Sequence, residues 1–250
     1  MIKKSFLSRK GTDLILGSLL GDGSLKIYPH YQNARFSFRH SIKQKDYFFW
    51  KMNELKEISS EKCWWKQKGG FSNSVVLRYQ SLALPLLSEI YDFTYVKGKL
   101  EVRRKWLNQL TPLSLAVWWL DDGSIIANGR KGVICTDAFS EGENILLKRY
   151  LAKVWNIETT LGSITRQYKG STRMYWRLWL RSTEELKKFL RIILPFVKVE
   201  SMLPKVLLLY KDFDLQQRWI SEISSLTGFK TSVIEKYGDA KKCRWKHFRE

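Results

Sequence analysis

The sequence has few cysteines and no long apolar run, and each of these features argues against a class of protein. Its 250 residues include 3 cysteines, Cys63, Cys135 and Cys243, which are scattered and odd in number. This usage argues against a disulfide framework, lacks the spacing of a zinc site and favours a reducing compartment. The sequence has no run of 18 apolar residues and no signal-peptide core at its amino end, so it predicts neither a membrane span nor a secretory signal.

The excess of basic residues is the strongest signal in the composition. Lys and Arg number 44 against 24 Asp and Glu, which gives a net charge of +20. Such a charge favours a polyanionic partner, above all nucleic acid, with an acidic membrane surface as the weaker alternative. The hydrophobic content of 44% is enough to pack a core. The length allows one large domain or two of about 100–150 residues.

One short pattern occurs twice. "LILGSLLGDGSLK" contains Asp22 followed by Gly23 and a serine, and "PLSLAVWWLDDGSII" repeats this arrangement at Asp122, 100 residues later. Each pattern predicts an apolar helix that ends at the aspartate, with Gly23 as the C′ residue that closes the first one. An aspartate at a helix C-terminus is unfavourable by a few tenths to about 1 kcal/mol, so its repetition points to a function. The alternative interpretation is that both units are ordinary helix exits.

The flanking segments also correspond, so the chain is predicted to be α+β, with two pseudo-symmetric αββαββα subdomains produced by a duplication. We expect helices at 12–21, 43–58 and 82–91 and again at 112–121, 141–155 and 183–194, with later strands at 62–67 and 74–80, then 159–168 and 174–181. The predicted boundaries are 1–93 for the first subdomain, 94–110 for a connector, 111–210 for the second subdomain and 211–250 for a basic extension.

Basic side chains alternate with apolar ones in the predicted strands. In "ARFSFRHS" the polar residues Arg35, Ser37 and Arg39 alternate with Phe36, Phe38 and His40. The stretch "MYWRLWLRS" repeats the pattern. Period-two alternation turns one set towards a core and the other outward. An arginine-rich sheet face suits a DNA groove, although an ordinary solvated face is the alternative. The candidate DNA-binding residues are Arg35, Ser37, Arg39, Lys66, Arg78, Arg177 and Arg181.

Small residues in the first repeated helix predict a close approach of the two helices. Gly17, Ser18 and Gly21 form a patch that Ala116 of the second helix only partly matches. Helices that cross there would bring Asp22 and its counterpart together, and two carboxylates repel each other unless cations lie between them. Magnesium prefers such hard oxygen ligands, and it can activate water for phosphodiester hydrolysis.

The two motifs resemble those of a known family. "ILGSLLGDG" (15–23) and "LAVWWLDDG" (115–123), with "LTPLSLAVWWLDDGS" around the second, are similar to the motifs of the monomeric LAGLIDADG homing endonucleases, and the resemblance spans about residues 10–210. It implies a DNA-binding saddle whose two antiparallel sheets lie in the major groove and whose motif helices pack at the central interface. It also implies that Asp22 and Asp122, with the main-chain carbonyls of Gly21 and Asp121, bind the catalytic divalent ions.

The resemblance implies a basic residue near each scissile phosphate. Lys99 in "VKGKLEV" matches the first such position, with Lys97 as its competitor. Lys205 in "SMLPKVL" matches the second, although Pro204 stands where the family more often has an aromatic residue. Arg39 is expected to approach the site.

The histidines are interpreted as structural. His30, His40 and His247 do not form a metal or catalytic cluster in the sequence, and His40 falls in the apolar register of its strand.

The resemblance thus implies a magnesium-dependent monomer that makes a double-strand break at a long asymmetric DNA target, across the minor groove. An intron RNA maturase and a cleavage-dead DNA-binding protein are the alternatives on the same fold. Retention of both acids argues against the cleavage-dead form, and the lack of flanking splicing blocks argues against an endonuclease resident in an intein. The resemblance favours an intron-encoded protein of a mitochondrion or plastid.

Overall fold

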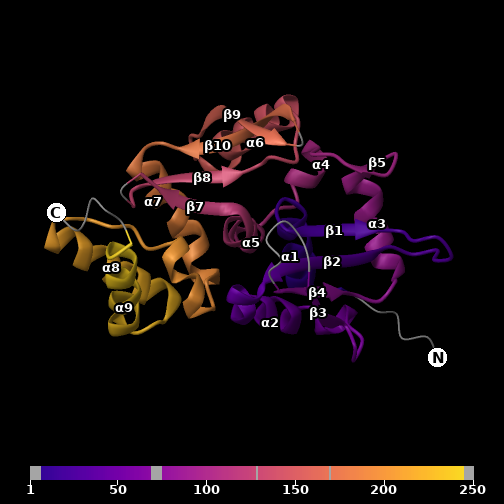
Figure 1. Ribbon diagram of the computed structural model, residues 1–250, viewed down its shortest axis with the longest axis horizontal. Coiled ribbons are helices and arrows are strands. Elements are labelled where there is room, and N and C mark those ends of the chain that lie inside the picture. Colours follow the sequence, from indigo (N-terminus) through magenta and orange to yellow (C-terminus); the bar gives the residue numbers. More distant parts are fainter. Residues whose placement is uncertain (1–6, 69–74, 128, 169, 245–250) are drawn as a thin grey trace. The chain divides into compact units, whose positions relative to one another are not determined.

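The computed structural model describes residues 7–68, 75–127, 129–168 and 170–244. The chain divides into two compact units, Met1–Asp121 and Asp122–Glu250, and each is described by itself (Figure 1). Each unit is built on a four-stranded antiparallel sheet, and the two sheets have the same strand order, β1-β2-β4-β3 and β7-β8-β10-β9. This shared topology confirms the predicted mixture of helices and strands in two equivalent halves.

The first unit contains five α-helices and two sheets in its described part. Its elements are α1 (Arg9–Leu19), β1 (Gly23–Lys26), β2 (Arg35–Ser41), α2 (Lys45–Glu54), β3 (Trp64–Lys68), β4 (Val75–Gln80), α3 (Pro85–Thr94), β5 (Tyr95–Val96), β6 (Lys99–Leu100), α4 (Arg104–Leu107) and α5 (Pro112–Asp122), whose last residue opens the second unit.

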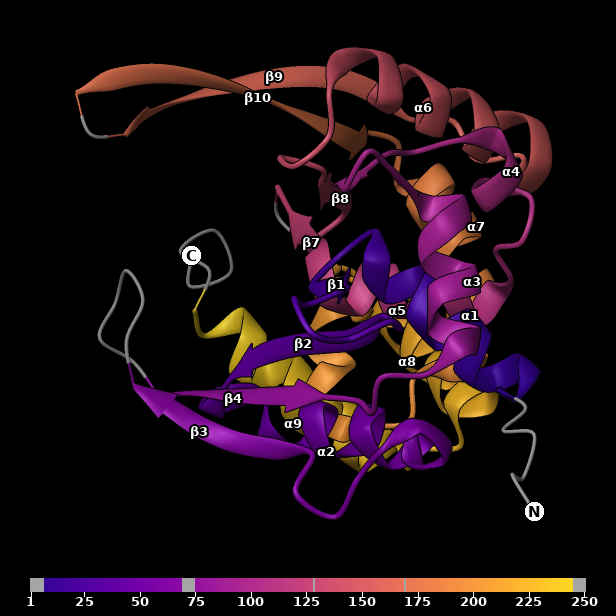
Figure 2. The ribbon, with the colours of Figure 1, turned by 90° about the vertical axis from the view of Figure 1, so that its right-hand side faces the viewer.

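The second unit repeats the ββαββα order of β1 to α3, and its described part then adds 3-10 turns and two α-helices. Its elements are β7 (Gly123–Ile126), β8 (Lys131–Cys135), α6 (Glu141–Trp155), β9 (Thr160–Tyr168), β10 (Ser171–Leu180), α7 (Thr183–Ile193), the 3-10 helix η4 (Glu200–Lys205), α8 (Phe213–Thr227) and α9 (Thr231–Lys242). The β9–β10 hairpin forms a long ribbon (Figure 2).

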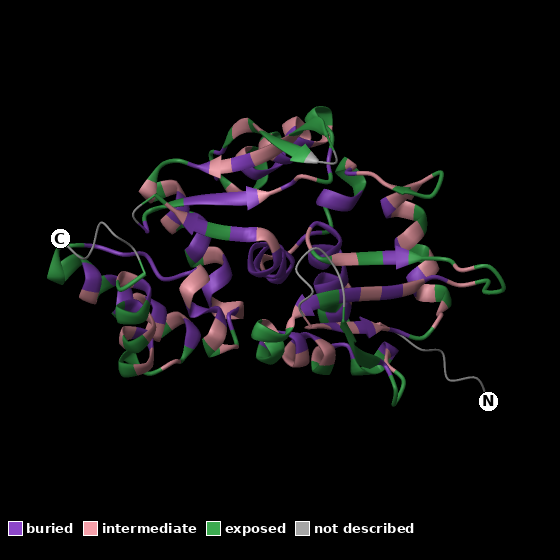
Figure 3. Cartoon of the chain, viewed as in Figure 1, coloured by how far each residue is buried: buried purple, intermediate pink, exposed green. Residues whose placement is uncertain are grey.

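Each core lies between one face of a sheet and the helices that cover it. In the first unit Phe38 of β2 stacks on Tyr79 of β4 with ring centroids 4.8 Å apart, and Phe48 of α2 lies 5.2 Å from Phe38. These three aromatic residues are buried, and full burial of such a side chain contributes about 1.5–3 kcal/mol. The burial pattern is visible in Figure 3, where the motif helix α5 is buried along almost its whole length.

Three local expectations need correction. The helix expected at 43–58 is broken into a 3-10 turn at Ile42–Gln44, α2, and a second 3-10 turn at Lys56–Ile58. The helix expected at 82–91 begins at Pro85, because proline suits the first turn of a helix. The last correction concerns Gly23. It is the first residue of β1 and does not have a positive φ, so it is not a C′ glycine.

The glycine at position 23 is required by packing. A Cβ there would lie 2.7 Å from Cβ of Ser18 and 2.8 Å from its carbonyl oxygen.

Among the described residues, no helix combines the length and the apolar character that a membrane crossing requires.

Candidate active site

The two motif helices, α1 and the part of α5 up to Asp121, approach each other closely within the first unit. A Cβ on Gly17 would lie 2.3 Å from the carbonyl oxygen of Ser114. At the next contact, a Cβ on Gly21 would lie 2.6 Å from Cβ of Asp121. The predicted close approach is therefore confirmed, and Ser114 and Asp121, rather than Ala116, face the glycines.

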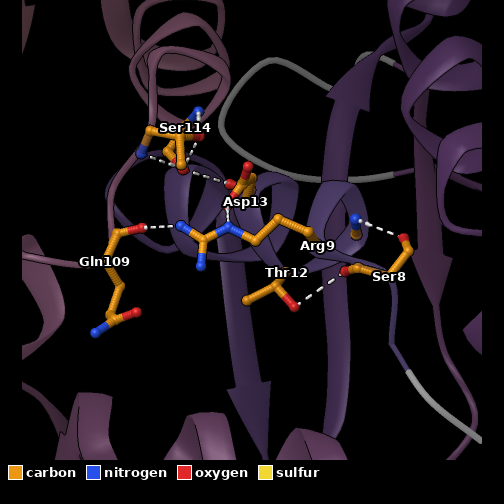
Figure 4. A network of polar contacts seen from close by, with 8 residues as sticks. Ser8, Arg9, Thr12, Asp13, Gln109 and Ser114 are labelled. Carbon is orange, nitrogen blue, oxygen red and sulfur yellow. Dashed lines mark hydrogen bonds and ion pairs between the residues drawn. The ribbon is translucent and has the colours of Figure 1, made fainter.

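A polar network holds the first turns of these helices together (Figure 4). Ser114 Oγ donates to the carbonyl oxygen of Asp13 at 2.9 Å. Arg9 pairs with the Asp13 carboxylate at 3.0 Å and donates to the carbonyl oxygen of Gln109 at 3.2 Å. Burial raises the pKa of Asp13, while Thr111 and Arg9 oppose this effect. The network fixes the register that brings Gly21 to Asp121.

The first predicted acid, Asp22, follows α1 directly. Its side chain is 39% exposed, and its Oδ2 lies 3.3 Å from Nδ1 of His40. Its backbone N–H donates to Oδ2 of Asp121 at 3.3 Å. His40 comes from β2, and its side chain is fully buried. The sequence interpretation of His40 as structural missed this contact with the acid.

Asp121 has a role that the sequence did not predict, because its side chain, as well as its main chain, takes part in the site. Lys51 of α2 donates to Oδ1 and Oδ2 at 2.7 and 2.8 Å, and both side chains are 0% exposed. Tyr47 donates its hydroxyl to Oδ1 at 2.9 Å, and burial together with the Asp121 charge raises the pKa of Tyr47. Lys51 Nζ also lies 4.9 Å from the ring centroid of Phe38. His40 Nε2 completes the cluster, 3.9 Å from Asp121 Oδ1.

One sequence signal could have located Lys51. It follows the apolar Tyr47 by four residues and Phe48 by three, so it falls on the buried face of α2. A lysine on such a face requires a buried anion.

Asp22 lines a pocket of about 410 Å³ on the outer face of the first sheet. The register pairs Arg39 with Arg78, so both guanidinium groups project from this face. The pocket is lined by Gly21, Asp22, Gly23, Ser24, Ser37, Phe38, Arg39 and Arg78. It thus brings together the first acid and three of the predicted DNA-binding residues.

The remaining predicted residues of the first unit lie elsewhere. Arg35 is half-buried and stacks over Tyr31 at 4.3 Å. Lys66 pairs with the buried Leu77, so its side chain projects from the opposite face to Arg78. Lys99 is an exposed residue of the short β5–β6 hairpin.

Asp122 ends α5 and begins the second unit, where its charge acts on two neighbours. Burial is the main reason that the pKa of Cys135 is raised, and the Asp122 charge adds to this shift. Hydrogen bonding to Asp137 is the main reason that the pKa of Arg177 is raised, and the Asp122 charge makes a smaller contribution. Cys135 lies opposite Arg177, as Arg39 lies opposite Arg78 in the first sheet. The two acids therefore occupy equivalent positions in their own units, but their surroundings differ in chemistry.

Arg177 is held by a carboxylate on its own sheet face. Its Nε and Nη2 donate to Asp137 at 2.8 and 2.9 Å, and this hydrogen bonding is the main reason that the pKa of Arg177 is raised. Arg166 also pairs with Asp137, at 3.2 Å. Arg181 is exposed beside the Trp179 ring.

The second predicted lysine, Lys205, is a half-buried residue at the end of η4 in the second unit. His30 is exposed and has a φ of 73°, while His247 lies outside the described residues.

A divalent ion fits the Asp22 side of the cluster. Asp22, His40 and Asp121 offer three possible ligand atoms within 4.8 Å of one another. Both Asp121 oxygens already accept hydrogen bonds from Lys51, which lowers their capacity to bind an ion. The partly exposed Asp22 carboxylate supplies a hard oxygen beside a pocket that can hold the waters Mg²⁺ retains.

Known proteins share the fold and the sequence pattern of this chain. Residues 12–189 match the model of the LAGLIDADG DNA endonuclease family. The homing endonuclease I-WcaI, solved bound to its DNA recognition sequence, superposes with a TM-score of 0.69 at 18% identity, covering 83% of this chain and 91% of that one. This likeness confirms the expected fold.

Several curated proteins are similar in sequence. DNA endonuclease I-ChuI of Chlamydomonas applanata is 31% identical over 176 residues, 64% of this chain and 80% of that protein. Protein RecA of Mycolicibacterium flavescens is 29% identical over 205 residues, 76% of this chain and 45% of that protein. Cytochrome b mRNA maturase bI2 of Saccharomyces cerevisiae is 27% identical over 195 residues, 74% of this chain and 44% of that protein. The chain spans less than half the length of the RecA relatives. Because the family match covers more than half of the chain, the protein belongs to the LAGLIDADG DNA endonuclease family.

Proposed function

We propose that the protein is a sequence-specific DNA endonuclease that hydrolyses one phosphodiester bond in each strand of a long asymmetric target. The observation that carries the proposal is the pocket where Asp22 lies beside Arg39 and Arg78 on an open sheet face. The motif repeats at Asp122, and the net charge is +20. A relative carries the name of a DNA endonuclease, and a protein of the same fold binds its DNA recognition sequence.

In this mechanism Asp22 and Asp122 would each hold a divalent ion, one for each strand. A bound Mg²⁺ would polarise a phosphate oxygen and lower the pKa of the attacking water. His40 orients the Asp22 carboxylate, and the Asp121 carboxylate accepts from the Asp22 backbone N–H and holds its main chain. Arg39 and Arg78 attract the phosphodiester backbone into the pocket. We assign Lys99 and Lys205 one scissile phosphate each.

The decisive experiment compares Asp22→Asn and Asp122→Asn with wild type. The target is first selected from a randomised DNA library with Mg²⁺ present and is then placed in a supercoiled plasmid. Each substitution keeps the shape of the side chain but removes a charged ligand. Double-strand cleavage should fall by several orders of magnitude, while specific binding persists or tightens because like-charge repulsion is relieved.

Asp92→Asn is the matched control, because Asp92 is an exposed residue of α3 outside the pocket. It should cut at the wild-type rate. Ca²⁺ should support binding without cleavage, because its looser coordination does not orient the attacking water. Cleavage by both acid variants at the parental rate would refute the mechanism. Cleavage in excess chelator by metal-free protein would refute the requirement for a divalent ion.

A maturase activity is the second candidate, favoured by the similarity to the cytochrome b mRNA maturase. A splicing assay on the intron that encodes the chain would detect it, and the Asp22→Asn variant should keep it. We also propose that the protein acts as a monomer and that its gene lies in an intron of a mitochondrion or plastid.

A further inference from the structure

The segment 204–210 contains Lys205 and the residues that follow it. Its main-chain groups have an unusual set of hydrogen-bond partners. After η4 it forms no regular helix or strand, yet Val206, Leu207, Leu208 and Leu209 are all 0% exposed. Buried main-chain groups must find partners. The N–H groups of Val206 and Leu207 donate to the carbonyl oxygen of Leu203, and the N–H of Leu209 donates to that of Gly129. The other buried main-chain groups of the segment need partners from elsewhere in the unit.

Side chains of α8 and α9 provide many of these partners. Lys241 of α9 donates to the carbonyl oxygens of Pro204 and Leu207, both at 2.7 Å. From α8, Trp219 Nε1 donates to the carbonyl oxygen of Val206 at 3.2 Å. Lys205 thus lies between two residues whose carbonyls the extension holds.

Gln216 of α8 continues the pattern. Its side-chain amide donates to the carbonyl oxygen of Leu208 at 3.1 Å and accepts from the backbone N–H of Tyr210 at 2.9 Å. Gln216 and Trp219 are both buried, so these bonds are shielded from water. Three side chains of the extension therefore fix five main-chain groups in seven residues.

The use of a lysine here is costly. Lys241 is only 9% exposed, and burial lowers its pKa to about 7. An apolar residue would avoid this desolvation cost but would leave two buried carbonyls without these donors. A neutral amine still has two N–H groups, so the geometry holds in either protonation state.

We propose that α8 and α9 are a positioning device for Lys205, with Lys241 as the main positioning residue and Trp219 and Gln216 as its supports. This inference rests on the proposed function, in which Lys205 serves one strand. By fixing the main chain on both sides of Lys205, the extension holds its ammonium group in register with one scissile phosphate. A misplacement of about 1 Å is enough to cost orders of magnitude in rate.

The test is strand-resolved cleavage by Lys241→Met on a linear target whose two strands carry different end labels. Lys205→Met identifies the strand that Lys205 serves. Lys241→Met should slow the same strand about tenfold or more and leave the other strand within about twofold, so nicked product accumulates. Lys236→Met is the matched control, an exposed lysine on the same helix, and both strands should be cut at the wild-type rate.

Trp219→Phe keeps the proposal testable if Lys241→Met does not fold. It removes one donor while keeping most of the packing, and it should slow the same strand by a smaller factor. The double variant Lys205→Met/Lys241→Met should cut that strand no more slowly than Lys205→Met alone, because both changes act through one group.

Two results would overturn the inference while leaving the endonuclease assignment intact. One is equal slowing of both strands by Lys241→Met and Trp219→Phe, since that indicates only a loss of stability. The other is wild-type cleavage of both strands by folded Lys241→Met. Failure of the wild-type protein to cut any selected DNA would instead refute the proposed function, and this inference with it.

Discussion

Replacing Lys51 with methionine should show whether the buried charge cluster holds the first motif together. Methionine keeps much of the apolar length of the side chain but removes the ammonium group that contacts both Asp121 oxygens at 2.7 and 2.8 Å. Both partners are 0% exposed, so the variant leaves a carboxylate in the interior without its cation. Breaking such a pair by removing one partner costs about 3–5 kcal/mol.

The remaining contacts of Asp121 set where in that range the result should fall. Tyr47 still donates its hydroxyl at 2.9 Å, and a hydrogen bond to a charged group is worth about 1.5–3 kcal/mol. We therefore expect a loss near the lower limit, about 3 kcal/mol. At about 2–4 °C per kcal/mol for a chain of this size, the melting temperature should fall by about 6–12 °C.

The assay is thermal and urea unfolding of purified protein, with Lys10→Met as the matched control. Lys10 pairs with Glu54 at the surface, where its side chain is 56% exposed, and such pairs contribute about 0–1 kcal/mol. The double variant Lys51→Met/Asp121→Asn should lose less than the sum of its single variants, since it leaves no buried charge of the pair uncompensated. A Lys51→Met loss as small as that of Lys10→Met, or full additivity, would refute the reasoning.

Four further outcomes are expected. Gly17→Ala should destabilise the protein by about 1–3 kcal/mol through overpacking. Gly142→Ala, where nothing lies within 4 Å of the added Cβ, should instead raise the stability by up to about 1 kcal/mol. Equal unfolding midpoints for the two variants would contradict the helix contact. Filter binding should give a slope of log K against log salt steeper than about −3, at about −0.9 per neutralised phosphate, and a shallower slope would mean that the charge does not engage the backbone. Arg177→Met should relax base preference in one half-site only, and Asp137→Asn should do so more weakly; an equal change at both half-sites would show that the sheet assignment is wrong. The folded-state pKa of Lys241 is about 7 and its ordinary value is 10.5, so the unfolded chain binds more protons than the folded one between these pH values. The free energy of unfolding should therefore rise with pH in this range, by at most about 1.4 kcal/mol per pH unit. Lys241→Met should remove this rise.

The sequence was most informative where the determining pattern is local. The apolar periods of α1 and α5 and the alternation in β2 lie within a few residues, so the helices and the inward set of Phe36, Phe38 and His40 could be predicted. The repeated Asp-Gly-Ser also marked both acids without any knowledge of the fold.

The parts that could not be predicted depend on contacts between distant segments. Lys51 and Asp121 are 70 residues apart, and a buried ion pair breaks the rule that charges lie outside. The sequence predicts Lys66 and Arg78 as DNA-binding residues together, but the pairing register, which composition does not determine, turns Lys66 to the other face of the sheet. The role of α8 and α9 was unpredictable for the same reason, since their partners are main-chain groups.

The glycine at position 21 and the aspartate at position 121 also bear on the history of the chain. The repeat predicts an ancestor whose two halves were alike, and in such an ancestor both positions carried the same residue. In this protein the pair has become complementary, because Asp121 occupies the space that Gly21 leaves open and neutralises Lys51. A change at either position alone now has a cost, because a side chain at position 21 would overlap Asp121, and loss of the Asp121 carboxylate would leave Lys51 buried without its anion. The divergence of these two positions therefore disfavours a return to two identical halves, since an assembly of two copies of either half would lack the complementary residue.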